Sequence, residues 1–471
     1  MIYINGNWKE GKGKKFNSIN PSDNSIIWEG NFASSSQVKD AIKSARKAFP
    51  IWSKQPLESR LKIIKKFYSL VELNKDKIQN LIRKETGKEE FDSLSEVGAS
   101  LAKYTNSLNA FHERTGKSTS SLGNNIQITN HKPHGILNVI GPFNFPFHLP
   151  NGHITPALIA GNVIIFKPSE HTPMVAELMV DLWHEAGLPN GVINLLHGSK
   201  EIVQSLAKHP QTNGVLFTGS YTVGLSLNRL MSNYPHKILA LELGGNNPLV
   251  VWSTRKIIKA TDIAFESAFI STGQRCTCAR RLILPNNKSS KKLIKILKNK
   301  SKDISFSEQS KNYFYGPLIS REAVKNFLNF QDALIKAGGK VILKGRSIKS
   351  KGNFVSPAII DMTNAKRQFD KEMFGPLIQV KYVDAFDDAI AEANNTSFGL
   401  SAGLVSDNKK LFDKFIQGVS AGVINFNTTT TGASGGAPFG GPGMSGNLRP
   451  AGFYAADYCA WPVASVINEN L

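Results

Sequence analysis

The sequence predicts an α/β protein with parallel, doubly wound sheets, and three observations support this fold class. From about Gly135 onward, short aliphatic and β-branched runs alternate with stretches of helical periodicity. Such an order places a helix between successive parallel strands. The length of 471 residues suffices for two to four domains, each with its own core. A glycine-rich break at residues 244–248 then separates two α/β units.

The elements of the first unit lie before this break. Apolar runs of four to six residues bounded by turn residues are typical of buried strands, and apolar residues repeating every three to four positions are typical of helices. Strands are expected at 136–140, 163–166, 192–196, 215–218 and 238–243, and helices at 174–186, 201–208 and 222–233.

The same alternation resumes after Pro248. A glycine-rich stretch at 432–446 has no repeat and precedes aromatic and apolar residues, which predicts a long ordered loop. Strands are expected at 249–251, 281–284, 341–343, 378–382 and 423–425, and helices at 262–270, 288–302, 322–337, 387–393 and 409–417.

Composition excludes several classes of protein. The net charge is +21, from 57 basic and 36 acidic residues, but the lysines are scattered, and the dense run at 288–302 is typical of a solvated helix face rather than a nucleic-acid site. The apolar stretch at 154–166 is interrupted and too short to span a membrane. The first residues do not resemble a signal peptide, and three cysteines do not form a disulfide framework. A cytoplasmic protein without nucleic-acid or membrane partners is expected.

Literal motif matches carry little weight here. Residues 441–446 fit G-x-G-x-x-G but contain Pro442, follow no strand and open no helix, so they do not predict a dinucleotide site. The spacing of Cys276 and Cys278 is not a zinc motif, and no metal site is expected.

Three other positions are candidates for binding or catalysis, and each also has a purely structural explanation. Gly219 and Ser220 stand at a strand-to-helix junction, where backbone N–H groups bind phosphate, although turns and helix caps use the same residues. Cys276 lies among Arg275, Arg280 and Arg281, which predicts a lowered thiol pKa, although a lone cysteine is often simply buried. The Glu242 carboxyl between two leucines suits a general base or a surface strand end.

Taken together, these positions resemble the aldehyde dehydrogenase superfamily over essentially the whole chain. Seven motifs occur in the family's order: residues 142–146 (PFNFP), 167–170 (KPSE), Gly219 and Ser220 with Gly224, 242–245 (ELGG), 273–276 (GQRC), 372–376 (EMFGP) and 438–441 (PFGG). The loop at 142–146 carries Phe143 where the family often has Trp, a mild departure.

The resemblance implies three catalytic residues. Cys276 would attack the aldehyde carbon as a thiolate, and the Asn144 amide with the Cys276 backbone N–H would stabilise the resulting oxyanion. Glu242 would activate the water that hydrolyses the thioester. Members that pass the acyl group to coenzyme A usually lack this glutamate, so the resemblance implies release of a free acid.

The resemblance also implies NAD as the cofactor. Lys167 and Glu170 match residues that hold the adenosine ribose, and a carboxylate there suits a 2′-hydroxyl better than a 2′-phosphate. Glu372 would bind the nicotinamide ribose beside Phe374. The full set of expected cofactor residues is Lys167, Ser169, Glu170, Gly219, Ser220, Gly224, Glu372 and Phe374.

Several further stretches resemble a narrower group within the family, whose aldehyde substrate carries two carboxylates. They are residues 148–153, 242–248, 273–281, 445–450 and the distinctive tail at 454–462. Arg275, His148 and Arg449 are therefore candidate substrate-binding residues. Their alternatives are a structural ion pair, a packed core histidine and an interface salt bridge. Cys278 and Cys459 are expected to be structural.

Two other functions stay open at this point. One is a dehydrogenase of another acidic semialdehyde, such as succinate or glutamate semialdehyde. The other is a basic, inactive scaffold, which the presence of Cys276, Asn144 and Glu242 disfavours.

By resemblance the fold has three parts. These are a Rossmann-like NAD-binding domain (1–115 and 136–241), an α/β catalytic domain (242–430), and a small β oligomerisation element with the C-terminal substrate loop and tail (116–135 and 431–471). The polar stretch at 118–130 suits a hairpin that reaches a partner subunit, so a homodimer or a dimer of dimers is expected.

Overall fold

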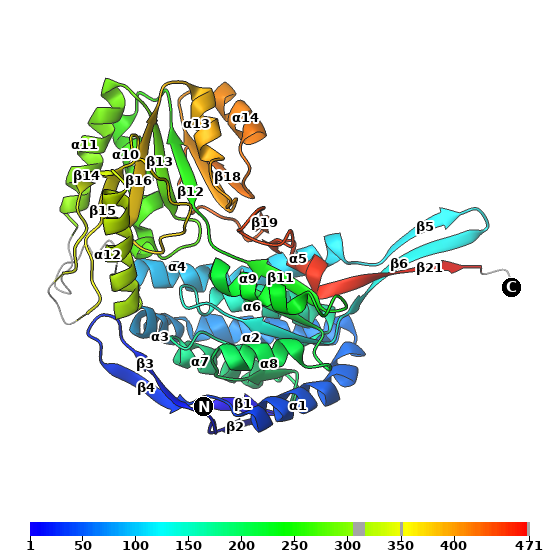
Figure 1. Cartoon of the computed structure of the whole chain (residues 1–471). Helices are drawn as coiled ribbons and strands as arrows, with labels where there is room; N and C mark the ends of the chain where they lie inside the picture. The colour runs from blue at the N-terminus through cyan, green and yellow to red at the C-terminus, as the bar shows by residue number, and fades with distance from the viewer. Residues whose placement is uncertain (305–315, 349–351, 469–471) are drawn as a thin grey trace.

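The computed structural model, described here for residues 1–304, 316–348 and 352–468, contains two seven-stranded sheets and a projecting arm (Figure 1). The first sheet is parallel through its centre, and its only antiparallel pairings in the described chain involve the N-terminal strands β1 and β2. Its strand order is β11 (Ile238–Glu242), β10 (Gly214–Thr218), β7 (Ile136–Ile140), β8 (Val163–Lys167), β9 (Ile193–Leu195), β1 (Ile2–Ile4) and β2 (Asn7–Lys9).

The second sheet is also parallel, except that β14 pairs antiparallel with β15. Its order is β14 (Lys340–Leu343), β15 (Ala358–Asp361), β16 (Leu377–Val383), β13 (Ala279–Pro285), β12 (Asn247–Val251), β17 (Ser401–Val405) and β18 (Val423–Phe426). The chain passes from one sheet to the other between Glu242 and Asn247, at the predicted break. The predicted α/β class and fold are confirmed.

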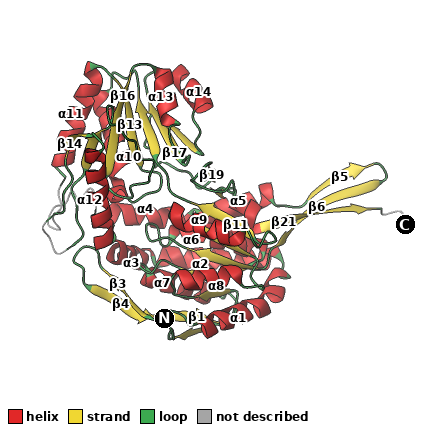
Figure 2. Cartoon of the chain, in the orientation of Figure 1, coloured by secondary structure: helices red, strands yellow, loops and turns green. Residues whose placement is uncertain are grey.

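Helices surround the strands of both sheets (Figure 2). With the first sheet are α1 (Ser35–Ser53), α2 (Leu57–Leu73), α3 (Lys75–Thr86), α4 (Glu90–Leu101), α5 (Lys103–Arg114), α6 (His148–Ala160), α7 (Pro173–Glu185), α8 (Lys200–Lys208) and α9 (Tyr221–Met231). With the second are α10 (Ile257–Phe269), η1 (Ile270–Gly273), α11 (Lys288–Lys302), α12 (Arg321–Lys336), α13 (Phe386–Ala393) and α14 (Lys409–Gly418).

The arm is a three-stranded antiparallel sheet that extends away from both units (Figure 1). The expected hairpin forms β5 (Ser118–Leu122) and β6 (Asn125–Pro133), and the C-terminal strand β21 (Ala460–Ile467) pairs with β6 along its length. The glycine-rich loop is ordered, as predicted, and contains β19 (Pro438–Phe439). The remaining elements are the hairpin β3 (Lys15–Ile19) and β4 (Ile26–Asn31), β20 (Ala451–Gly452) and α15 (Ala455–Cys459).

The order of strands in the first sheet creates a place for a ligand. From β7 the chain moves to β8 and β9 on one side, and then returns to β10 and β11 on the other side. The loops that leave the carboxyl ends of β7 and β10 therefore diverge to opposite faces and leave a crevice between them.

Candidate active site

A cavity of about 710 Å³ lies at this crevice, beneath the second sheet. The first sheet contributes the carboxyl ends of its strands, and the second contributes the loops that precede β12, β13 and β16. Most residues predicted for catalysis and cofactor binding line this cavity: Asn144, Lys167, Ser169, Glu170, Gly219, Ser220, Glu242, Cys276, Glu372 and Phe374.

Cys276 follows a tight backbone turn at the end of α10. Ser271, Thr272 and Gly273 all have positive φ angles, of 54°, 56° and 69°. A Cβ at Gly273 would also lie 2.2 Å from the Gly375 carbonyl oxygen, so only glycine fits there. After the turn, the Asn247 side chain donates hydrogen bonds of 2.7 and 2.9 Å to the carbonyls of Cys276 and Cys278. The nucleophile is thus presented by a loop that is fixed on both sides.

The thiol of Cys276 does not have the lowered pKa that its arginine neighbours predicted. Burial is the largest cause that raises its pKa to about 12, followed by the charges of Glu372 and Glu242, and only Arg280 opposes them. The guanidinium of Arg280 itself donates to backbone carbonyls, including that of Gly273 at 2.7 Å. The predicted lowering of the Cys276 pKa is therefore wrong, because the guanidinium groups of this loop bind other groups of the protein.

Asn144 and the backbone of Cys276 provide two donors on one side of the cavity. The Asn144 Nδ2 atom donates to the Gln274 carbonyl at 3.1 Å, which uses one of its two hydrogens. The Cys276 N–H has no hydrogen-bond partner within the described ranges. Two donors next to a nucleophile are the arrangement that stabilises a tetrahedral oxyanion.

Glu242 ends β11 with a buried carboxyl group. Its Oε1 accepts a hydrogen bond of 2.9 Å from the Ala451 N–H, whereas Oε2 has no partner in the described part of the chain. Burial raises the pKa of Glu242 well above its ordinary value, and the Ala451 hydrogen bond and the charge of Lys103 oppose this shift. A buried carboxyl with one free oxygen suits a general base.

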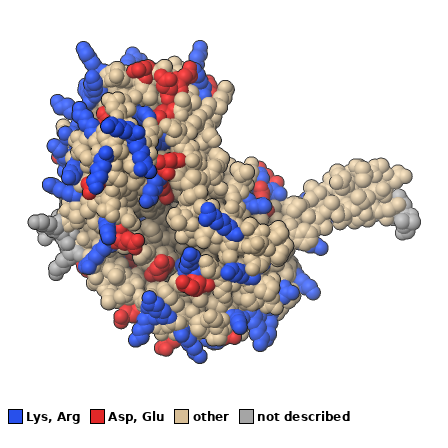
Figure 3. Space-filling view, in the orientation of Figure 1, with Lys and Arg blue, Asp and Glu red and all other residues tan. Residues whose placement is uncertain are grey.

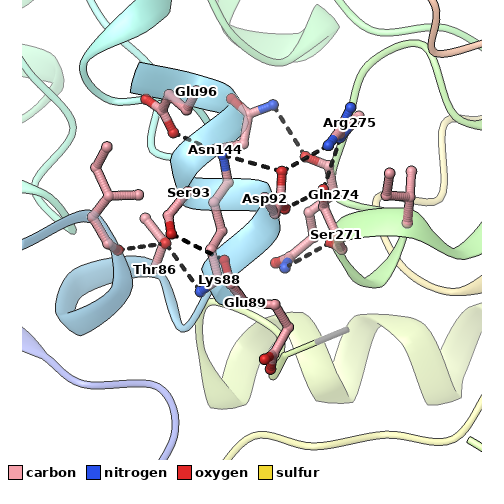
Figure 4. Close-up of polar contacts among 12 residues, drawn as sticks. Thr86, Lys88, Glu89, Asp92, Ser93, Glu96, Asn144, Ser271, Gln274 and Arg275 are labelled. Atoms are coloured by element: carbon pink, nitrogen blue, oxygen red, sulfur yellow. Dashed lines mark hydrogen bonds and ion pairs between the residues drawn. The ribbon is translucent and has the colours of Figure 1, made fainter. Parts of the chain in front are cut away.

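Two carboxylates of α4 hold the loops that carry these groups (Figure 4). Asp92 accepts a bond of 2.6 Å from Arg275 and one of 2.5 Å from Ser271 in the cysteine loop. Glu96 accepts the backbone N–H groups of residues 147 and 148, just after Asn144, and forms an ion pair of 2.8 Å with Lys88. The oxyanion donors and the nucleophile are therefore positioned by one helix.

The opposite end of the cavity carries the groups predicted for adenosine and pyrophosphate. The buried Lys167 ammonium lies 3.4 Å from the Glu170 carboxylate. Ser220 caps α9 by accepting from the Val223 N–H, which directs the start of that helix toward the cavity. Gly224, which lies within α9, does not line the cavity. It packs against Leu243, and a Cβ at Gly224 would lie 2.4 Å from that leucine.

Glu372 and Phe374 lie nearer the nucleophile. The Glu372 carboxyl accepts a bond of 3.3 Å from the Gly245 N–H, and burial raises its pKa to about 7. Phe374 makes an edge-to-face contact with Phe143, so the residue that replaces the frequent Trp still packs beside the cavity.

Comparison with known proteins agrees with this geometry. A model of the aldehyde dehydrogenase family matches residues 8–461. The chain belongs to the aldehyde dehydrogenase family.

Relatives and solved structures extend the comparison. The chain is 46% identical to the N-succinylglutamate 5-semialdehyde dehydrogenase of Acinetobacter baylyi, over all of this chain and 96% of the relative. It is 45% identical to the protein of that name from an Enterobacter species, over all of this chain and 95% of the relative. A putative aldehyde dehydrogenase from Burkholderia cenocepacia superimposes with a TM-score of 0.93 at 27% identity, over 100% and 97% of the two chains. A mutant 1-pyrroline-5-carboxylate dehydrogenase from Thermus thermophilus gives 0.93 at 26%, over 99% and 92%.

The three substrate-binding candidates of this aldehyde dehydrogenase occupy different surroundings. Arg275 forms an ion pair of 2.6 Å with Asp92 and does not line the cavity, which matches its structural alternative. Arg449 is exposed and lines a separate cavity of about 230 Å³, on the other side of Glu242. His148 lines the main cavity, and its Nδ1 has no hydrogen-bond partner among the described residues.

Four residues near the chemistry of this aldehyde dehydrogenase were not predicted. Asp92 and Glu96 position the loops, and Lys103 and His153 line the cavity beside Glu242. Lys88, Asp92 and Glu96 recur at four-residue spacing, which is typical of an exposed helix face, whereas in the structure Lys88 precedes α4 and all three side chains are buried.

The described residues of this aldehyde dehydrogenase contain neither a metal-site cluster nor a membrane-spanning helix. Within residues 1–304, 316–348 and 352–468, no group of three or more His, Cys, Asp or Glu side chains has the arrangement of a metal site. Over the same ranges, no helix has the length and apolar character that a membrane span requires. On the face shown in Figure 3, Lys and Arg side chains are spread over the body of the molecule, while the arm carries few.

Proposed function

We propose that this enzyme oxidises N-succinyl-L-glutamate 5-semialdehyde to N-succinyl-L-glutamate with NAD, a step of arginine degradation by the succinyltransferase pathway. The names of relatives at 43–46% identity over the full chain support this substrate. The observation that carries the proposal is that Cys276, Asn144 and Glu242 line one cavity.

The reaction begins at the sulfur of Cys276. After the thiol gives its proton to solvent water, the sulfur attacks the aldehyde carbon as a thiolate, and the carbonyl oxygen becomes an oxyanion that accepts from Asn144 Nδ2 and the Cys276 N–H. Bound NAD supplies the acceptor for the hydride that leaves this carbon. The product on Cys276 is a thioester.

Glu242 then acts on the thioester. Its free oxygen takes a proton from a water molecule, whose oxygen attacks the thioester carbon; the carbon–sulfur bond breaks and Cys276 leaves as a thiolate. The acid is released, and no transfer to coenzyme A is needed. The Ala451 hydrogen bond holds the other carboxylate oxygen and so fixes the direction of this base.

The residues of the cavity fit NAD. The Glu170 carboxylate beside Lys167 suits a ribose with a free 2′-hydroxyl and would repel a 2′-phosphate. The start of α9 at Gly219 and Ser220 would receive the pyrophosphate, and Glu372 the nicotinamide ribose beside Phe374. Solved aldehyde dehydrogenase relatives of similar fold include a betaine aldehyde dehydrogenase from Staphylococcus aureus crystallised with NAD.

We assign three parts to the molecule on this basis. Residues 1–115 and 136–241 form the NAD-binding domain, residues 242–430 the catalytic domain, and residues 116–135 with 431–471 the oligomerisation element and substrate loop. The projecting arm supports a homodimer or dimer of dimers, because a three-stranded sheet of this kind buries little of its own surface. The three cysteines, all free in the structure, support a cytoplasmic location.

The test is NADH formation, followed by absorbance, with three aldehydes. We expect kcat/KM to be highest for N-succinylglutamate 5-semialdehyde, lower for succinate semialdehyde and lowest for neutral butanal, and to fall when NADP replaces NAD. Equal turnover of the three aldehydes would overturn the substrate assignment, and absence of turnover would overturn the activity.

A further inference from the structure

Lys103 places a buried ammonium at the aldehyde end of the cavity. It is the first residue of α5, it is 8% exposed, and it lines the cavity with Glu242, His148 and His153. A Cβ at Gly152 would lie 3.4 Å from the Lys103 Nζ, so this glycine of α6 leaves the space that the ammonium occupies.

Lys103 differs from the other buried cations of the described ranges, each of which has an ion pair or a hydrogen bond. Lys88 forms an ion pair with Glu96, Lys167 with Glu170 and Arg281 with Glu392. Arg60, Lys237 and Arg280 donate to backbone carbonyls instead. Within the described ranges, the Lys103 Nζ has no hydrogen bond or ion pair, and burial lowers its pKa to about 8. Such a desolvated cation is costly unless an anion completes its surroundings.

The groups around Lys103 do not supply that anion. His148 and His153 have pKa values lowered by burial first and then by the charge of Lys103, so they stay neutral. Glu242 lies beyond ion-pair distance, since no contact within 4.0 Å joins it to a cation in the described chain, and Oε2 of Glu242 is free for the base role. The other cavity-lining lysines are Lys167, which ends β8, and Lys200, which follows β9, and both lie at the cofactor end.

We propose that the Lys103 ammonium binds a carboxylate of the substrate and determines the preference for acidic aldehydes. This inference rests on the proposed function and deepens it, because it replaces Arg275 and Arg449 with a cation that faces the cavity. A charge-assisted hydrogen bond in a desolvated site gives such selectivity, since the same site would leave the ammonium unpaired with a neutral aldehyde.

The test compares Lys103→Met with Lys103→Arg and with the control Lys66→Met, which removes one exposed charge on α2. Steady-state kinetics are measured with succinate semialdehyde, butanal (which has a methyl group in place of the carboxylate) and N-succinylglutamate 5-semialdehyde. For Lys103→Met we expect KM for the acidic aldehydes to rise about 30-fold or more, kcat/KM for butanal to stay within about twofold, and Lys103→Arg to recover part of the loss.

Two other outcomes would overturn the role of Lys103, and a third would overturn only the proposed substrate. An unchanged KM for succinate semialdehyde overturns the proposal. An equal fall of kcat with acidic and neutral aldehydes also overturns it, since Lys103 would then act on Glu242. If N-succinylglutamate 5-semialdehyde is not used but the acidic preference for succinate semialdehyde disappears in Lys103→Met, the role of Lys103 stands and the proposed substrate fails. The thermal midpoint of each variant shows whether it is folded. Lys103→Gln provides a second neutral substitution if Lys103→Met misfolds.

Discussion

The Oε1 atom of Glu242 accepts a hydrogen bond of 2.9 Å from the Ala451 N–H, although 209 residues separate the two in sequence. This contact ties the end of β11 to β20 in the C-terminal segment. The contact also gives the two carboxylate oxygens of Glu242 different surroundings, because Oε1 is hydrogen-bonded while Oε2 has no partner among the described residues. The C-terminal segment therefore orients the proposed base.

Replacement of Glu242 by Gln should separate the two halves of the reaction. The amide keeps the acceptor for the Ala451 N–H but cannot take a proton from water, so we expect kcat to fall by about 10²- to 10⁴-fold. The thioester should accumulate, which mass spectrometry of the quenched enzyme detects together with a burst of about one NADH per site. Normal turnover without an acyl adduct would exclude Glu242 as the base.

The high pKa of Cys276 predicts how the thiol reacts with iodoacetamide. The thiolate is the reactive form, and its fraction rises about tenfold per pH unit below a pKa of about 12. The alkylation rate should therefore rise steadily from pH 7 to pH 10 without a plateau. Cys278 and Cys459 are fully buried, so only Cys276 should be labelled in the folded enzyme.

The control is Cys276→Ser, which should remain unmodified over the same interval. A plateau near pH 8 in the wild-type enzyme would show that the arginines lower the thiol pKa, as the sequence alone had indicated.

The strand and helix pattern from about Gly135 onward was predictable because its periodicity is strong. The expected strand at 136–140 coincides with β7, and the expected helix at 409–417 ends one residue before the end of α14. By contrast, α6 was not expected, because it is buried on nearly all sides and contains Pro156, so it shows no apolar stripe. The N-terminal helices α1–α5 and the strands β15, β17 and β21 were also not expected.

Some of the functional residues could also be identified from the sequence, and others could not. Cys276, Asn144 and Glu242 were recognisable because their motifs are local, and each lies in or beside a loop that the motif itself encodes. The surroundings of Lys103 and Asp92 were not, because a charged residue on a helix looks the same in sequence whether tertiary packing buries it or leaves it in water.

Asp92→Asn should destabilise the enzyme and disturb the cysteine loop. Asp92 is 1% exposed, and it pairs with Arg275 while accepting from Ser271, so the variant leaves a guanidinium that is only 14% exposed without its charge partner. Breaking such a pair costs about 3–5 kcal/mol. We expect a lower urea midpoint together with a reduced kcat, because the loop presents the nucleophile.

A matched control is Glu72→Gln, which removes an exposed pair with Lys75 and should cost less than about 1 kcal/mol. If the two variants had the same urea midpoint, the Asp92 pair would not hold the loop.

The arm is the part of the molecule that we expect to hold subunits together. Its C-terminal strand exposes Val466 and Ile467, which are 60% and 41% accessible in the single chain, and β21 is an edge strand with unpaired backbone groups. Exposed apolar side chains on a free edge favour pairing with another subunit. Changing both residues to Asp should therefore reduce the sedimenting mass from a multiple of 51.6 kDa toward that of one chain. Leu73→Asp, at an exposed position on α2, is the control and should leave the mass unchanged. A wild-type chain that sediments as a monomer would refute the proposed role of the arm.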